Sequence, residues 1–275
     1  MKKIISVINQ KGGVGKTTTV VNLSTALAQL GKKILVIDLD PQGNATTGLG
    51  RSNGENEKNI YKVIIGQSDL KNSIQKSCVE NLDIIGSNVD LSGLEVETAT
   101  DPNRAFLLKE ILREKNKDLL SVYENIFIDC PPSLSLLTVM SLVVADELLV
   151  PLQTEFFALE GVSQLVKTIE RIKINLNPTL EIRGILLTMF DKRNKLSTQV
   201  DDEARKFFKE KVYKTVIPRN VRLSEAPSHG VPCILYDKSC LGSKSYTKLA
   251  KEFIEQKNIV GDWCLMQKKK GSGEV

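Results

Sequence analysis

The stretch Lys11-Gly12-Gly13-Val14-Gly15-Lys16-Thr17-Thr18 lies between a short apolar run, residues 4–8, and a helical pattern over residues 17–30. Glycines let a loop curl so that successive backbone N–H groups point toward one anion, and the start of the following helix adds the positive end of its dipole. Gly31 ends the helical pattern, and a second apolar run follows at residues 33–38. The order strand, glycine-rich loop, helix and strand predicts a βαβ unit with parallel strands.

The same alternation continues along the chain. Apolar runs without period-two alternation, typical of strands covered on both faces, predict strands at 82–85, 125–129, 147–152, 182–189 and 212–217. Helical patterns lie at 104–123, 134–144, 159–175, 197–211 and 243–256. We therefore expect an α/β fold: a doubly wound, mostly parallel sheet with helices on both faces. We expect one domain over residues 1–256 and a flexible C-terminal tail over residues 257–275.

The composition is that of a globular protein. Of 275 residues, 41% are hydrophobic and 26% are charged, which excludes disorder along the whole chain. The five cysteines are scattered without a CxxC pair, which argues against a disulfide framework or a zinc site and favours a reducing cytosol. The most apolar stretch, residues 134–152, is broken by polar residues and by Pro151. We expect a cytoplasmic protein without stable membrane insertion.

Positive charge is concentrated in one stretch. The net charge of the whole chain is only +5, but residues 192–222 contain ten basic and four acidic residues. The remainder of the chain is therefore close to neutral. This distribution predicts a local basic surface on a near-neutral body.

The glycine-rich loop resembles a phosphate-binding loop in a deviant form. The strict pattern GxxxxGKS/T requires glycine where this chain has Gln10, and the loop carries an additional lysine, Lys11. In such a loop Lys16 reaches the β- and γ-phosphates, and the Thr17 hydroxyl binds Mg²⁺. The sequence thus predicts a site for a nucleoside triphosphate with magnesium.

Three aspartates follow predicted strands. Asp38 and Asp40 lie at the end of the strand that follows the first helix, and Asp129 ends the strand over 125–129. Because the carboxyl ends of strands in an open α/β sheet face the ligand crevice, we expect all three beside the loop. Asp129 is the natural acid to hold Mg²⁺ through water.

Four segments together resemble one family of proteins. Residues 11–18, 38–44, 129–133 and 217–232 look like the ParA/Soj group of partition ATPases, within the MinD/ParA superfamily that carries the deviant Walker A loop. The segment 217–232 is the most specific, because it separates ParA/Soj proteins from other members of the superfamily. The resemblance extends from about residue 2 to residue 254.

The resemblance implies ATP and Mg²⁺ as cofactors, slow ATP hydrolysis, and roles for particular residues. It implies that Lys11, Lys16 and Asp40 are catalytic, with Lys11 crossing to the nucleotide of a partner subunit and Asp40 positioning the attacking water. The ATP contacts it implies are Lys11, Gly12, Gly13, Val14, Gly15, Lys16, Thr17, Thr18, Pro218 and Asn220. The switch that senses the γ-phosphate would comprise Asp38, Asp40, Pro41, Asp129, Pro131 and Pro132.

The resemblance also implies three partners. ATP would hold two copies of the chain in a homodimer, which would bind double-stranded DNA without sequence preference and so associate with the nucleoid. Many phosphate contacts give such binding its salt dependence. The candidate DNA contacts are Arg193, Arg219 and Arg222, with Lys192, Lys195, Lys248 and Lys251 as weaker ones. A ParB-type protein would accelerate hydrolysis and so release the dimer.

Two other interpretations of the sequence stay open. A MinD-like ATPase that cycles on and off a membrane would use the tail, which carries Ile259, Val260, Trp263, Leu265 and Met266 before three lysines. A metabolic enzyme on the same scaffold would phosphorylate a small substrate. It would need an additional polar pocket, which the sequence does not reveal.

Overall fold

The computed structural model describes residues 3–52, 54, 58–155 and 158–256. Its strands form one sheet in the order β3-β4-β2-β5-β1-β6-β7. All neighbours in it are parallel except β3 and β4, which are antiparallel. The strands are β1 (Lys3–Val7), β2 (Ile34–Asp38), β3 (Gln75–Lys76), β4 (Leu82–Ile85), β5 (Asn125–Asp129), β6 (Glu147–Gln153) and β7 (Glu181–Thr188).

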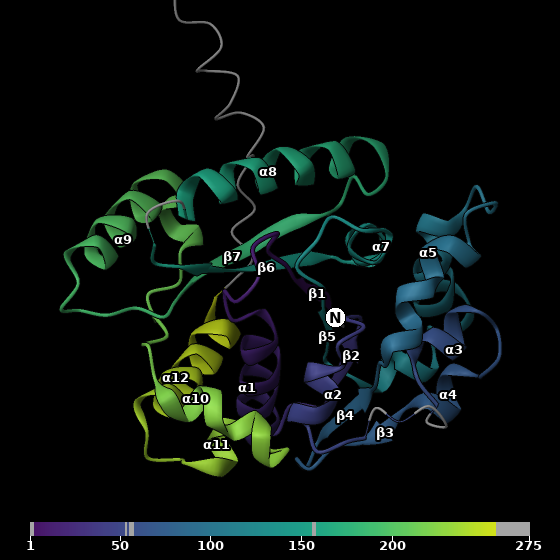
Figure 1. Ribbon diagram of the computed structural model, residues 1–275, viewed down its shortest axis with the longest axis horizontal. Helices are drawn as coiled ribbons and strands as arrows, with labels where there is room; N and C mark the ends of the chain where they lie inside the picture. The colour runs from purple at the N-terminus through teal and green to yellow at the C-terminus, as the bar shows by residue number, and fades with distance from the viewer. Residues whose placement is uncertain (1–2, 53, 55–57, 156–157, 257–275) are drawn as a thin grey trace, which may run out of the picture.

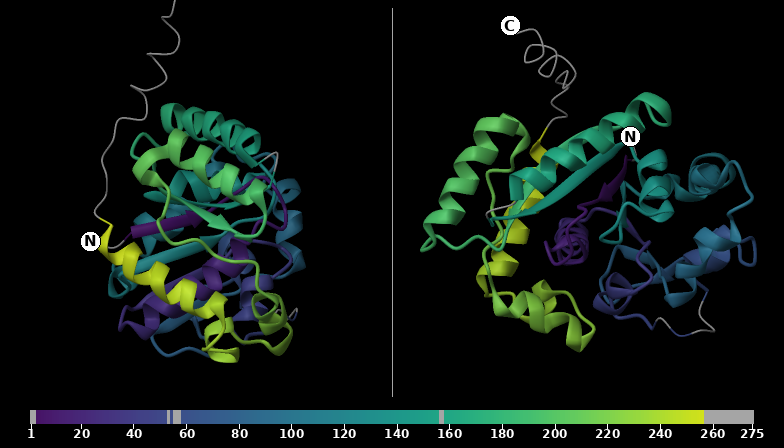
Figure 2. Two further views of the ribbon diagram at one scale, coloured as in Figure 1. Left: turned by 90° about the vertical axis from the view of Figure 1, so that its left-hand side faces the viewer. Right: turned by 45° about the horizontal axis from the view of Figure 1, so that its top comes forward.

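Helices cover both faces of this sheet (Figures 1 and 2). One face is covered by α1 (Lys16–Gln29) and by the helices that pack around it. These are α2 (Asn44–Gly48), α10 (Val221–Glu225), α11 (Cys233–Tyr236) and α12 (Leu241–Glu255). The remaining helices are α3 (Ile60–Ile64), α4 (Leu70–Ser73), α5 (Leu94–Glu97), α6 (Leu107–Lys109), α7 (Leu136–Val144), α8 (Ala158–Asn175) and α9 (Lys195–Phe208). This arrangement confirms the predicted doubly wound, mostly parallel fold.

The central strands are buried on both sides, as their continuous apolar runs predict. Successive side chains of β5 alternate between two cores. Ile126 belongs to the core shared with α7 and α8, whereas Phe127 belongs to the core shared with α1 and α12. The Phe127 ring lies 5.8 Å from that of Phe253. Both layers thus hold β1, β2 and β5 in place, and with them the loops at their carboxyl ends.

The predicted strand over 212–217 is wrong. This segment forms no regular ladder with β7 and its extension: the bridges of Ile185 with Val212 and of Phe190 with Pro218 are isolated. The N–H groups of Tyr213 and Ile217 donate to the Ile185 and Leu187 carbonyls of β7 at 3.0 and 2.9 Å. The backbone N–H groups of Lys214 and Thr215 donate instead to the carboxylate of Glu252 on α12, at 2.6 and 2.9 Å. A side chain from a distant helix therefore satisfies the groups that a regular strand would pair.

The continuous helix predicted over 104–123 is also wrong. The segment consists of a 3₁₀ turn at Arg104–Phe106, the short α6, a π-helical stretch at Glu110–Lys115 and a second 3₁₀ turn at Leu119–Val122. The Asn116 side chain donates to the Ile111 carbonyl at 3.0 Å. Such side-chain bonds compete with the regular helical pattern.

The other predicted elements are confirmed, with ends displaced by at most three residues. The largest displacement is at the end of α9, where a 3₁₀ turn at Lys209–Lys211 follows the α-helix. Gly31 follows α1 with a φ of 81°, in the left-handed region typical of helix ends. The predicted tail over 257–275 lies outside the described residues. Within the described part, no helix is long and apolar enough to cross a bilayer.

Candidate functional site

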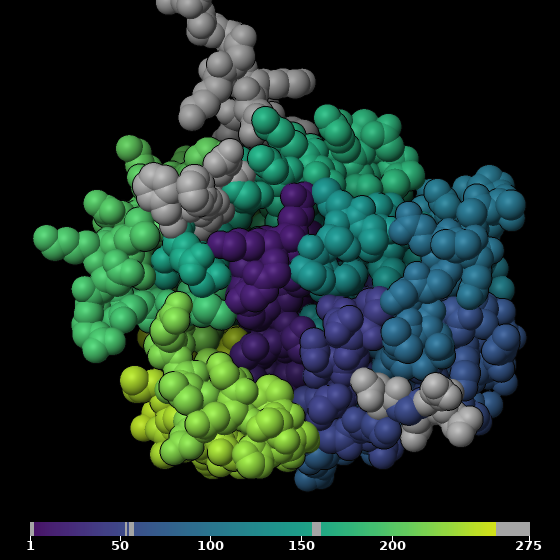
Figure 3. Space-filling model, in the orientation of Figure 1, coloured from purple at the N-terminus to yellow at the C-terminus, as the bar shows by residue number. Residues whose placement is uncertain are grey.

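The glycine-rich loop connects β1 to α1 at the carboxyl edge of the sheet. Gly13 and Gly15 have φ values of 74° and 87°, a backbone region that favours glycine. Gly15 lies directly before the first residue of α1, so the loop runs into the free N–H groups of the helix. The purple N-terminal segment that contains this loop reaches the surface at the centre of the face in Figure 3.

Strands β6 and β7, which lie on the same side of β1, hold the loop. The Asn9 side chain donates to the Pro151 carbonyl at 2.7 Å and accepts the Lys11 N–H at 3.0 Å. The Thr188 hydroxyl, at the end of β7, donates to the Val14 carbonyl at 2.9 Å. The loop is therefore fixed before any ligand arrives, which reduces the entropic cost of binding.

Lys16 lies inside the loop. Its side chain is only 7% exposed, and its Nζ donates to the Lys11 carbonyl at 3.2 Å. Burial lowers the pKa of Lys16, while the nearby carboxylates of Asp129 and Asp40 act in the opposite direction. An ammonium held in this position is suited to bind phosphate oxygens.

The three predicted acids lie together beside the loop. Asp38 ends β2, Asp129 ends β5, and the two are register partners. Asp38 Oδ2 accepts the Thr46 N–H at 2.8 Å and the Thr46 hydroxyl at 2.7 Å, and its Oδ1 accepts the Asp40 N–H at 3.2 Å. Burial raises the pKa of Asp38 to about 6. Burial, followed by the charge of Asp38, raises the pKa of Asp129 well above its ordinary value.

The residues beside the loop fit a magnesium ion. The Thr17 hydroxyl donates to Asp129 Oδ2 at 2.7 Å. Asp129 Oδ1 is buried and has no hydrogen-bond partner among the described residues. Mg²⁺ prefers hydroxyl, carboxylate and water oxygens as ligands. A cation with its bound water would give this oxygen the missing partner and would favour the ionised carboxylate.

The predicted switch residues border the same site. Asp40 is 7% exposed and its Oδ1 accepts the Gln42 N–H at 3.0 Å, closing the turn that contains Pro41. Pro131 is buried after β5, and Pro132 is exposed. A Cβ atom built on Gly12 would lie 3.8 Å from Pro132 Cβ, so this proline lies against the loop.

Lys11 points away from its own loop. Its Nζ forms an ion pair of 2.8 Å with Glu155, just beyond β6, and both side chains are about half exposed. The Gln153 side chain donates to the other carboxylate oxygen of Glu155. Within one chain, therefore, the position of Lys11 is set by Glu155.

Pro218 and Asn220 lie next to the carboxyl end of β7. Pro218 bridges to Phe190, two residues beyond the Thr188 that holds the loop. Asn220 is the N-cap of α10, and its side chain accepts the Arg222 N–H at 3.1 Å. The structure thus brings both residues to the side of the site formed by the end of β7.

Comparisons with known proteins agree with this geometry. Residues 2–182 match a family model described as an AAA domain. The chain is 49% identical over 254 residues to the chromosome partitioning protein ParA of Caulobacter vibrioides, covering 92% of this chain and 94% of that protein. It is 50% identical over 252 residues to the sporulation initiation inhibitor protein Soj of Bacillus subtilis, covering 92% of this chain and 98% of that protein. The chain belongs to the ParA/Soj family of chromosome partitioning ATPases.

A solved structure with the same fold comes from a metabolic enzyme. Cobyrinic acid a,c-diamide synthase of Mycobacterium smegmatis, crystallised with an ATP analog and magnesium, has a TM-score of 0.80 and 31% identity, covering 91% of this chain and 93% of that one. The higher identity to ParA and Soj places this chain with the partition ATPases rather than with the synthase.

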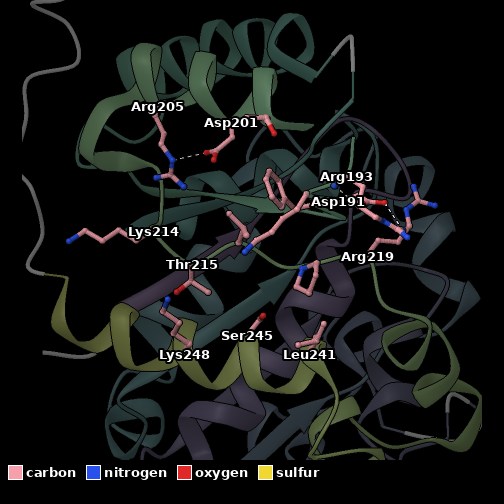
Figure 4. Close-up of a pocket in the computed structure, with 15 residues that line it drawn as sticks. Asp191, Arg193, Asp201, Arg205, Lys214, Thr215, Arg219, Leu241, Ser245 and Lys248 are labelled. Carbon is pink, nitrogen blue, oxygen red and sulfur yellow. Dashed lines mark hydrogen bonds and ion pairs between the residues drawn. The ribbon is translucent and has the colours of Figure 1, made fainter. Parts of the chain in front are cut away.

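The ParA/Soj-family chain also carries a basic cleft between α9, α12 and the segment after β7, with a volume of about 920 Å³ (Figure 4). Arg193 and Arg219, two of the predicted DNA contacts, line it, and Arg222 does not. The Arg193 guanidinium pairs with Asp191 at 3.0 Å. Arg222 instead pairs with Glu225 at 2.8 Å and lies 3.5 Å from Asp237. The other basic residues of the cleft are Lys192, Arg205, Lys214 and Lys248.

The structure adds residues that sequence reasoning missed. Thr46 binds Asp38, Thr188 holds the loop, and Glu155 pairs with Lys11. Thr188 lies at the end of the predicted strand 182–189, and Glu155 follows the predicted strand 147–152. Both positions are at the same sheet edge as Asp38 and Asp129, and this placement is the signal that could have identified them. Thr46 carried no such signal, because it lies in a short helix that was not predicted.

Proposed function

We propose that this ParA/Soj-family chain is an ATP-driven partition protein whose nucleotide state controls its binding to DNA. The observation that carries the nucleotide half of this proposal is the combination of the buried Lys16 ammonium with the Thr17–Asp129 pair and its unpartnered oxygen. ATP and Mg²⁺ are the ligands that satisfy all of these groups together. When bound, ATP supplies the phosphoryl group, and Mg²⁺ supplies positive charge that stabilises the phosphate oxygens.

Each step of the reaction is assigned to residues of this chain. The N–H groups of the loop and the Lys16 ammonium bind the phosphates, and Thr17 with Asp129 would hold the magnesium, Asp129 through water. Asp40, close to the loop and slightly exposed, positions the attacking water. Pro218 and Asn220 border the base. Asp38, Pro41, Pro131 and Pro132 form the segments that respond to the γ-phosphate.

Lys11 acts between two copies of the chain. Its half-exposed ammonium is paired with Glu155. A surface pair of this kind costs little to break, so Lys11 can exchange Glu155 for the nucleotide of a partner subunit. We infer that ATP favours this homodimer and that hydrolysis, slow until a ParB-type protein binds, releases it.

The basic cleft is the surface that we assign to DNA. Arg193, Arg219, Lys214 and Lys248 come from three separate segments and line one cleft. Such a surface reads the phosphate backbone without sequence preference, and dimerisation doubles it. DNA binding would place the protein on the nucleoid.

Co-sedimentation with duplex DNA tests the proposal, using ATP, ADP or no nucleotide at two salt concentrations. We expect binding with ATP that is lost at high salt. Asp40→Ala should retain ATP-dependent DNA binding while turnover falls by about 10²–10⁴-fold, the usual contribution of such a group. Equal DNA binding in all nucleotide states would contradict nucleotide control. Absence of DNA binding with ATP-dependent binding to anionic vesicles would favour the MinD-like alternative.

A further inference from the structure

Two cysteine side chains outside the nucleotide site are in contact. Cys233 is the first residue of α11, Cys240 is the N-cap of α12, and their Sγ atoms lie 3.6 Å apart. A disulfide has an S–S bond of about 2.05 Å, so closure requires the sulfurs to approach by only about 1.5 Å. The connection between them consists of the rest of the one-turn helix α11 and a short turn, and neither is part of the sheet.

The two sulfurs differ in exposure. Cys233 is 1% exposed, and Cys240 is partly exposed. Burial raises the pKa of Cys233 to about 11, so this group stays a thiol until a reactive sulfur is brought against it. A reagent from solution therefore meets Cys240 first.

Ser243 joins the two thiols to the start of α12. Its Oγ lies 3.4 Å from both sulfur atoms, and its backbone N–H donates to Cys240 Sγ at 3.4 Å. A backbone N–H in the first turn of a helix stabilises a thiolate. Cys240, with this N–H bond and partial exposure, is suited to attack a disulfide in solution. Cys233, whose sulfur lies 3.6 Å away, is placed to attack the resulting mixed disulfide.

We propose that Cys233 and Cys240 form a redox-active dithiol that closes to an intramolecular disulfide when it meets a low-molecular-weight disulfide such as oxidised glutathione. The Cys240 thiolate attacks one glutathione sulfur, which forms a mixed disulfide and releases one reduced glutathione. Cys233 then attacks the Cys240 sulfur, its proton passes to solvent, and the second reduced glutathione leaves. Two protein thiols are oxidised, and one glutathione disulfide is reduced to two thiols.

Closure would fix the turn that faces α10. Asp237, between the two cysteines, accepts the N–H groups of Ser239 and Cys240 at 2.9 and 3.1 Å. Its carboxylate also lies 3.5 Å from Arg222 Nε. Because a disulfide restricts the unfolded chain, we expect the oxidised protein to melt at a higher temperature than the reduced one. Reversible disulfides of this kind are typical of redox sensing in reducing compartments.

The remaining cysteines allow a clean test. Cys78 is exposed and Cys264 lies in the tail, so we place Cys78→Ser and Cys264→Ser in one background and leave Cys130, Cys233 and Cys240. Cys130 is buried, and burial raises its pKa to about 12, which makes it an unreactive internal control. The full-length reduced protein is incubated with oxidised glutathione, after which free thiols are counted and peptides are mapped by mass.

In this background we expect the loss of two thiols, a peptide crosslinked through Cys233 and Cys240, and full recovery with dithiothreitol. Cys233→Ser should trap glutathione on Cys240 as a stable mixed disulfide. Cys240→Ser should retain its thiols. Persistence of both thiols in the background protein, or equal thiol loss after Cys240→Ser, would overturn the proposal. None of these measurements depends on nucleotide or DNA binding, so their outcome is independent of the proposed function.

Discussion

The phosphate loop and the basic cleft both collect charged side chains, but in opposite surroundings. At the loop Lys16 is 7% exposed, and Asp38 and Asp129 are fully buried. In the cleft the Arg193 side chain is 91% exposed. Electrostatic interactions are strong where water is excluded and are screened at the surface. The affinity of the loop for ATP should therefore fall strongly when a single buried residue is removed. The affinity of the cleft for DNA should instead be a sum of small, salt-dependent contributions.

Removal of the buried ammonium is the strongest test of this difference. We expect Lys16→Ala to lower ATP affinity by at least about 100-fold, because truncating one partner of a desolvated charge pair costs several kcal/mol. Isothermal titration calorimetry with ATP and Mg²⁺ measures the loss. Lys32→Ala, which removes a lysine paired with Glu124 at the surface, is the matched control and should bind ATP normally. Retained binding by Lys16→Ala would contradict the assignment of the loop.

The buried carboxylates predict that the nucleotide-free protein becomes less stable as pH rises. The folded pKa of Asp38, about 6, exceeds its ordinary value of 3.8, so the folded state binds the proton more tightly than the unfolded state. The free energy of unfolding should fall between pH 4 and pH 6–7, by up to about 3 kcal/mol from Asp38. The raised pKa of Asp129 acts in the same direction.

Urea denaturation at a series of pH values, without nucleotide or magnesium, measures this slope. Asp38→Asn should make the slope shallower for two reasons. One titrating group is removed, and the charge of Asp38 no longer raises the pKa of Asp129. Asp118→Asn, which removes the carboxylate of an exposed aspartate, is the matched control for the change of charge. A slope unaffected by Asp38→Asn would mean that Asp38 does not titrate in this range.

The two regions also differ in how far the sequence predicts them. The loop and the strands β4 and β5 follow from local signals, namely glycines, GKTT and continuous apolar runs. Asp38, Asp40 and Asp129 could be brought together because parallel strands end at one edge. The Lys11–Glu155 pair joins residues 144 positions apart, and no pattern in the sequence connects them.

The cleft depends on contacts that a sequence does not reveal. Segment 212–217 has the composition of a strand, but Glu252 from α12 takes two of its N–H groups. Arg222 and Arg219 look equivalent in the sequence, yet two carboxylates hold only Arg222. The roles of Arg219 and Arg222 in DNA binding stay predictions. The difference in their ion pairing leads to different expected losses of DNA affinity, which can be measured.

Arg219→Ala should weaken DNA binding more than Arg222→Ala. Arg219 lines the cleft and forms no ion pair with any described residue, whereas Arg222 is already neutralised by Glu225 and Asp237. We expect Arg219→Ala to lower affinity by roughly three- to tenfold and to reduce the salt slope by about 1. Fluorescence anisotropy with one labelled duplex, ATP and several salt concentrations compares the two variants. A larger loss for Arg222→Ala would move the DNA surface from the cleft to α10.

The smallest expected effect concerns Lys11, the charged residue of the loop whose exposure resembles that of the cleft. An exposed ion pair contributes about 0.2–1 kcal/mol, so Glu155→Gln should free Lys11 and strengthen the ATP-dependent dimer by at most about fivefold. Sedimentation velocity with ATP, in an Asp40→Ala background that slows hydrolysis, measures the dimer. Glu124→Gln breaks the equally short Lys32–Glu124 pair and should have no effect. The gain should vanish at high salt because screening already weakens the pair. A weaker dimer after Glu155→Gln would instead mean that Glu155 itself contacts the partner subunit or its nucleotide.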